Sequence, residues 1–119
     1  MAKTLTVVLA PAANTGGTLT LPAVTGQCHF ITSIQITRVA TAALTGSAVL
    51  DITTTNLNGS NWKVGNAMAA GGTQNDVQLS FAQPIRSDAA GVDTTIVFPA
   101  PGAAVQWIVN VTYYTGVAQ

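Results

Sequence analysis

Cys28 and His29 are the residues whose types most readily suggest chemistry: they are the one cysteine and the one histidine of the chain, and they are adjacent. A zinc site needs three or four converging ligands, and the other candidates are scattered aspartates. Adjacent residues on a β-strand also point to opposite faces, which argues against a shared metal and against a Cys–His catalytic pair. We therefore expect a buried cysteine beside a hydrogen-bonded histidine near the start of a strand, and no metal or other cofactor.

The acidic residues are equally sparse, because the chain has four aspartates and no glutamate. A glycosidase holds two carboxylates across a cleft, and only Asp88 and Asp93 share one segment, "RSDAAGVDTT". Short aspartates around a glycine are typical of capped turns, and the regular oxygen spacing of a calcium loop is missing. We therefore predict a turn here, and we expect Arg38 and Arg86 to pair with aspartates at subunit contacts.

Two tryptophans could supply a flat platform for a sugar. Trp107 alternates with valines in "VQWIVNV", a pattern that predicts a core position. Trp62 lies among polar residues in "NGSNWKVGN", and both an exposed and a buried position stay open for it. No glycine-rich stretch has the strand–loop–helix setting of a phosphate-binding loop, so we expect a protein that is not an enzyme. The candidate interaction residues are Trp62, Arg86, Asp88 and Asp93.

Charge is scarce along the whole chain: its 119 residues include four Lys or Arg and four acidic residues, for a formal net charge of zero. Soluble surfaces are typically about a quarter to a third charged, so this exterior must consist mainly of small uncharged residues. Such a surface suits permanent association, and we expect a homo-oligomer, with a trimer as the leading case. The lack of a basic patch argues against nucleic acid, and no apolar run approaches the ~20 residues of a membrane-spanning helix.

The elements that must position these residues have the patterns of strands. Thr, Val and Ile recur, the strong helix formers Glu and Lys are nearly missing, and Gly, Pro and Asn separate the alternating segments. The sequence therefore predicts an all-β protein, a single antiparallel β-sandwich or jelly-roll domain of about eight strands at residues 19–119. Residues 1–18 are predicted to form an N-terminal strand or an arm, and a strand is favoured over a signal peptide. The predicted strands cover residues 3–10, 18–24, 28–40, 47–55, 61–65, 76–81, 94–100 and 105–114.

Alternation also assigns the faces of these strands. In "DVQLSFAQPIRSD", the odd-numbered apolar residues fall on one side of an extended chain. The same pattern along the other strands predicts one core. Its expected members are Phe30, Ile34, Ile36, Leu50, Ile52, Leu79, Phe81, Ile96, Phe98, Trp107, Val109 and Val111.

Five motifs, in this order, resemble small virion structural proteins of tailed bacteriophages and prophages. The motifs are "HFIT" (29–32), "TTTNL" (53–57), "PIRS" (84–87), "DTTIV" (93–97) and "NVTYY" (110–114). The resemblance extends over about residues 18–116, and the ordered set carries no catalytic motif.

The resemblance implies a β-sandwich or jelly-roll subunit on a phage particle, made in the host cytoplasm, and in particular a head decoration (cement) protein. The implied partners are further copies of the chain, as a trimer, and the major capsid protein, with no nucleic acid and no membrane. Two alternatives stay open. The chain could be another virion module, such as a head fibre base, tail or adaptor protein. It could also be a glycan-binding host-attachment module that uses Trp62 and the Asp88–Asp93 loop.

Overall fold

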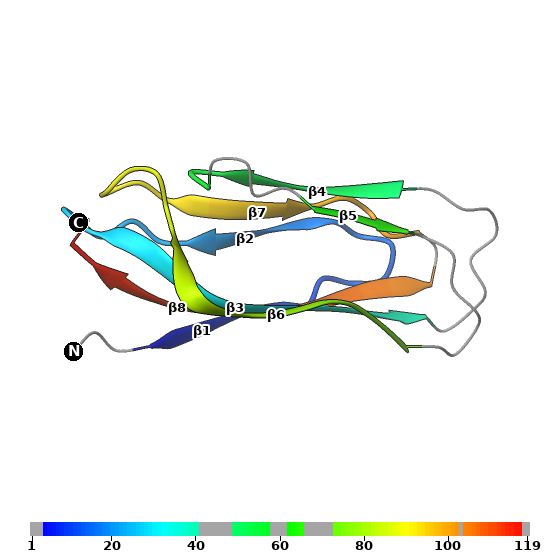
Figure 1. The fold of residues 1–119 in the computed structure, drawn as a ribbon. Coiled ribbons are helices and arrows are strands. Elements are labelled where there is room, and N and C mark those ends of the chain that lie inside the picture. The colour runs from blue at the N-terminus through cyan, green and yellow to red at the C-terminus, as the bar shows by residue number, and fades with distance from the viewer. Residues whose placement is uncertain (1–3, 41–48, 58–61, 66–72, 103, 118–119) are drawn as a thin grey trace.

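The computed structural model describes residues 4–40, 49–57, 62–65, 73–102 and 104–117. Two four-stranded antiparallel sheets pack face to face (Figure 1): sheet A in the order β1-β8-β3-β6 and sheet B in the order β2-β7-β4-β5. The strands are β1 (Leu5–Leu9), β2 (Gly17–Leu21), β3 (Cys28–Ala40), β4 (Val49–Thr55), β5 (Trp62–Gly65), β6 (Thr73–Arg86), β7 (Thr94–Phe98) and β8 (Val105–Gly116). The predicted all-β sandwich of about eight strands is confirmed. The described ranges contain no helix that could cross a bilayer.

The strand pairs form one long folded ribbon. The first strand pairs with the last, β2 with β7, β3 with β6, and β4 with β5 at the tip. Rolling this ribbon also brings β3 beside β8 and β4 beside β7. Two four-stranded sheets connected in this way are a jelly roll. The arrangement places the β2–β3 and β6–β7 loops together at one end of the sandwich, which we call the loop end (Figure 1).

β3 changes face part-way along its length because of a bulge. Its pairings with both neighbouring strands shift register between Ile31 and Ser33, and one extra residue moves the following side chains to the opposite face. Ile31 before the bulge and Ile34 after it are therefore both buried. Phe30, which alternation from Ile34 assigns to the core, lies instead on the outer face against Tyr114. The prediction for Phe30 was wrong.

The core lies between the sheets and is organised around Trp107. This side chain is fully buried, its ring centroid lies 5.3 Å from that of Phe98, and its Nε1 donates a 2.8 Å hydrogen bond to the Pro99 carbonyl. Arg38 is also fully buried, with its guanidinium carbon 5.6 Å from the Trp107 ring centroid, a cation–π distance. The expected pairing of Arg38 at a subunit contact was wrong, because the side chain lies inside its own domain. The core prediction is confirmed for Ile34, Ile36, Leu50, Ile52, Ile96, Phe98, Trp107, Val109 and Val111.

β6 forms one edge of sheet A, and its inward face is incompletely covered. Leu79 lies opposite the buried Ile34 but is 40% exposed. Phe81 is half-buried and packs against the core. The expectation that Leu79 and Phe81 help dominate the core was therefore wrong, because an edge strand has a partner on one side only.

β1 forms the other edge of sheet A. It pairs along its whole length with β8, from Leu5 opposite Tyr113 to Leu9 opposite Val109. Leu9 packs against the core and over Gly17, where a Cβ atom would lie 3.4 Å from Leu9 Cδ1. Residues 5–9 thus complete the sheet of their own chain. A role of residues 1–18 as an arm stays a prediction.

Candidate functional site

His29 lies in a buried hydrogen-bond network at the loop end. Its Nδ1 is 2.7 Å from Thr94 Oγ1, and its Nε2 is 2.7 Å from the Pro22 carbonyl oxygen. A carbonyl oxygen only accepts, so Nε2 donates, and a neutral ring then accepts at Nδ1 from the Thr94 hydroxyl. Cys28 is buried beside it. The predicted buried cysteine and hydrogen-bonded histidine are confirmed.

Two further residues fix the position of His29. Ser87 Oγ accepts a 2.9 Å hydrogen bond from the His29 backbone N–H, and the Ser87 N–H donates to the His29 carbonyl at 2.8 Å. The Tyr113 ring meets the imidazole edge-on, with centroids 5.7 Å apart. Tyr113 is 5% exposed, and this burial raises the pKa of its phenol above the ordinary 10.0.

Asn56 connects the end of β4 to the β6–β7 loop. Its backbone has a φ of 62°, in the left-handed region that Asn tolerates better than most residues. Its Oδ1 accepts a 2.8 Å hydrogen bond from the Ala89 N–H. Its Nδ2 lies 3.1 Å from Thr94 Oγ1, and also within reach of the carbonyl oxygens of Ala89 and Val92. The amide therefore holds this loop against sheet B.

The five motifs of the resemblance meet at this network. His29 belongs to "HFIT", Asn56 to "TTTNL", Ser87 to "PIRS", Thr94 to "DTTIV" and Tyr113 to "NVTYY". In the described part of the chain, no buried side-chain nitrogen or oxygen lacks a hydrogen-bond partner. A fully satisfied buried network rigidifies a fold, so we interpret this one as structural support and not as a reactive centre.

Asp88 and Asp93, the aspartates of the β6–β7 loop, lie in a segment whose hydrogen bonds hold loops of the fold together. Asp93 Oδ1 accepts a 2.7 Å hydrogen bond from the Ala23 N–H and so ties the two loops of this end together. Asp88 has an exposed side chain, and its backbone N–H donates to the Asn56 carbonyl at 2.9 Å. No group of three His, Cys, Asp or Glu side chains within the described ranges is placed to share a metal ion. These contacts agree with the predicted turn.

Trp62 lies apart from these aspartates. It is half-buried on β5, packs against the core, and pairs with Ile52 of β4. Asn56, which contacts the aspartate loop, lies four residues beyond Ile52, or about 13 Å along an extended chain. Arg86 lies on the other sheet, at the end of β6. The four candidate interaction residues therefore do not form one constellation.

The outer face of sheet B carries an array of uncharged side chains that we call the hydroxyl face. Its members are exposed or half-buried, and they lie in cross-strand register in two rows, Thr18–Val97–Thr53 and Thr20–Thr95–Thr55. The hydroxyl oxygens of Thr55 and Thr95 are 2.5 Å apart. Beyond the rows, Asp51 and Lys63 form an exposed ion pair. The sequence signal for this face is the spacing Thr-x-Thr, which becomes a surface only when the strand pairing is known.

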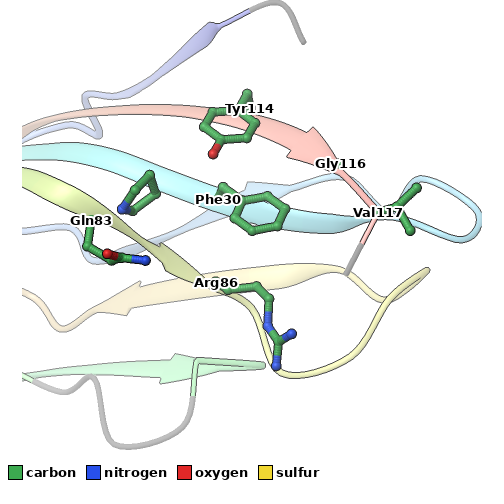
Figure 2. A pocket seen from close by; sticks show the side chains of 7 residues that line it. Phe30, Gln83, Arg86, Tyr114, Gly116 and Val117 are labelled. Atoms are coloured by element: carbon green, nitrogen blue, oxygen red, sulfur yellow. The ribbon is translucent and has the colours of Figure 1, made fainter. Parts of the chain in front are cut away.

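A second surface, the aromatic groove, lies on the outer face of sheet A and encloses about 620 Å³ (Figure 2). Phe30 and Tyr114 stack there with centroids 5.0 Å apart and an interplanar angle of 9°. Arg86 also lines this groove, and it is the one candidate interaction residue that does. Sequence reasoning missed the groove because it did not foresee the bulge in β3, which moves Phe30 outwards. The other lining residues are Gln83, Pro84, Gly116 and Val117.

No protein-family model, no curated protein and no solved structure matches this chain. Because fold alone does not imply function, the hydroxyl face and the aromatic groove are the features from which a function must be argued.

Proposed function

We propose that the chain is a bacteriophage virion structural protein, and in particular a head decoration (cement) protein that stabilises the capsid without catalysing a reaction. The five-motif resemblance supports a place in the virion. The jelly roll is compatible with that place, since viral capsid proteins use this architecture, although lectins and cupins use it too. The observation that carries the proposal is the hydroxyl face.

The hydroxyl face has the chemistry of a surface that packs against another protein. The cores of protein interfaces are depleted in charged residues, and burying an unpaired charge costs several kcal/mol. The two rows of this face contain no charge, so covering them requires only that the hydroxyls find partners or retain water. Burial of apolar area contributes about 25 cal/mol per Å², so a few hundred Å² per joint supplies several kcal/mol before association costs.

The proposed partners are the major capsid protein and further copies of the chain, as a trimer on the capsid surface. Another virion module, such as a head fibre base, tail or adaptor protein, would use the same face and is the second candidate. The separation of Trp62 from the aspartate loop gives no support to glycan binding by those residues.

Purified particles of the encoding phage or prophage provide the first test. Counted against the major capsid protein, the chain should be present in a fixed, high copy number. A low copy number would indicate a tail or fibre position and refute the decoration role. Absence of the chain from the particle would refute the virion assignment.

Particles made without the gene provide the second test, since purified protein can be added back and its occupancy measured. Substituting lysine at both Thr18 and Thr53 places two charges on the hydroxyl face and should weaken binding at least about 100-fold. Gln35→Lys adds one charge on the exposed outer face of sheet A and serves as the control. Wild-type occupancy by the double variant would show that the hydroxyl face does not make the contact. Sedimentation of the free protein tests the trimer, which a stable monomer at micromolar concentration would refute.

A further inference from the structure

Sheet A ends on each side at a strand that has a neighbour on one side only. In the order β1-β8-β3-β6, the two edge strands among the described residues are β1 and β6. The outer side of an edge strand presents a row of backbone N–H and C=O groups that can pair with another chain. Apolar side chains are also exposed at both edges, since Leu5 and Val8 on β1 are 41% and 58% exposed and Leu79 on β6 is 40% exposed. Both edges are therefore suited to bind a further strand.

The regular parts of these edges lack the usual protection against such pairing. Edge strands are commonly protected by a charged side chain, a proline or a bulge. β1 pairs in unbroken register with β8 and contains no charged residue. β6 contains Pro84 near its end, but its residues 77–80 pair in unbroken register with β3 and carry no charge. The unprotected stretches are thus all of β1 and residues 77–80 of β6.

The two edges are complementary in direction. Each pair of neighbouring strands in sheet A is antiparallel, so the first and last of its four strands run in opposite directions. When copies are related by rotation about an axis parallel to the strands, β6 of one copy runs antiparallel to β1 of the next. The junction then continues the antiparallel hydrogen-bond pattern of the sheet.

The two edges are also complementary in their side chains. Following the strand register across sheet A places Val7 in one row with Leu79, and Val8 in the next row with Gln78. The first row passes through buried residues of β8 and β3, so Val7 and Leu79 both point toward sheet B. When the rows of two copies are aligned, Leu79 lies beside Val7 of the next copy and its exposed apolar surface is covered. A slip of one residue would place core-facing side chains beside outward-facing ones, which favours the aligned register.

We propose that the β6 edge of one copy pairs with the β1 edge of the next, so that sheet A continues from subunit to subunit around a closed ring. Head-to-tail contacts of this kind form a ring when the rotation between copies closes. Pairing β6 with β6 would leave β1 open, and pairing β1 with β1 as well would extend the assembly without limit. The number of three subunits rests on the proposed function, whereas the β6–β1 contact does not depend on it.

Cysteine substitutions in the purified full-length chain test the contact. Val8 and Gln78 are both exposed, and three strand spacings, about 14 Å, separate them within one chain, which is too far for a disulfide. On mild oxidation, the double variant Val8→Cys/Gln78→Cys should form linked oligomers up to the trimer, and each single variant should stay unlinked. A bismaleimide whose reach is shorter than this distance gives the same readout without requiring disulfide geometry. The wild type, whose Cys28 is buried, is the control.

The crosslinked species separate this contact from the trimer of the proposed function. Linking of Gln78→Cys alone would show β6–β6 pairing and overturn the proposal. A double variant that sediments as a trimer but gives no crosslink would also overturn it, while the trimer itself would stand. Linked species larger than a trimer would support the β6–β1 contact and refute the number of three.

Matched lysine variants provide a second test by sedimentation at micromolar concentration. Leu79→Lys places a charge at the β6 edge and should convert the oligomer to a monomer. Val97→Lys changes a side chain of similar exposure, 37%, on the inner strand β7 of sheet B and should associate like the wild type. Urea unfolding establishes that both variants are folded. Wild-type association of Leu79→Lys would show that this edge does not make the contact, and a monomeric wild type would refute both the contact and the trimer.

Discussion

Asn56 offers a quantitative test of how the loop end is held. Asn56→Gly keeps a residue that tolerates the positive φ but removes the amide. The amide makes one strong acceptor contact, to the Ala89 N–H, and one partly buried donor contact, to Thr94. At about 1 kcal/mol net per hydrogen bond, Asn56→Gly should lower the free energy of unfolding by roughly 2 kcal/mol. Asn56→Ala removes the same contacts but, unlike glycine, keeps a Cβ atom in the left-handed region without the local hydrogen bonding that lets asparagine tolerate it, which adds about 1 kcal/mol.

Urea unfolding, followed by tryptophan fluorescence, measures the free energy of unfolding of both variants. The comparison requires that the slope of this free energy against urea concentration is the same for the variants and the wild type. For a domain of this size, the alanine variant should melt roughly 10 °C below the wild type and the glycine variant roughly 7 °C below it. Gln35→Ala, on the exposed outer face of sheet A, should stay within about 0.5 kcal/mol of the wild type. If alanine were tolerated as well as glycine, the backbone argument would fail. If both variants matched the wild type, Asn56 would not hold the loop.

Three further outcomes are expected. By the same assay, Trp107→Ala should lower the free energy of unfolding by roughly 3–5 kcal/mol, and Phe81→Ala should lower it by only about 1–2 kcal/mol. The reason is that Trp107 is fully buried whereas Phe81 is half-buried. Equal losses for the two variants would contradict the edge position of β6. Burial raises the pKa of Tyr113 in the folded state. The contribution of the neutral phenol to the free energy of unfolding is therefore complete below pH 10.0 and is lost as the pH rises through the raised pKa of the folded state. As the pH rises above 10.0, Tyr113→Phe should therefore lose less stability than the wild type, and parallel pH curves would disprove this. Deleting residues 1–12 should lower the free energy of unfolding by about 3 kcal/mol, since Val7 and Leu9 leave the core; an unchanged melting curve would show that β1 contributes nothing to the domain.

The fold class could be predicted from the sequence because alternation is a local signal. The prediction for residues 28–40 agrees with β3 at both ends, and Trp107 occupies the expected core position. Which side chains of a strand point to the core could be predicted only where the strand has no bulge. Phe30 was misplaced because a bulge depends on how β3 pairs with β6 and β8, which is not encoded in its own alternation.

The candidate site was less predictable for the same reason. Arg86 was predicted to be an interaction residue, but its neighbours Phe30 and Tyr114 in the aromatic groove come from strands distant in sequence. The threonines of the hydroxyl face form rows only through the pairing of β2, β7 and β4. Asn56 belongs to the "TTTNL" motif, but the partners of its amide lie in a loop that begins after β6, which the motif alone does not indicate.

The nested ribbon also sets the order in which the domain can form. The pairing of β4 with β5 joins neighbouring strands, whereas the pairing of β1 with β8 joins residues 5–9 to residues 109–113. Closing a long chain segment costs more entropy than closing a short one, and folds dominated by distant pairings fold slowly. β8 is the last strand in chain order, yet it lies between β1 and β3 within sheet A. A ribosome must therefore make β8 before sheet A can close, so the hydrophobic faces of the earlier strands stay uncovered during synthesis and depend on the final strand for protection against aggregation.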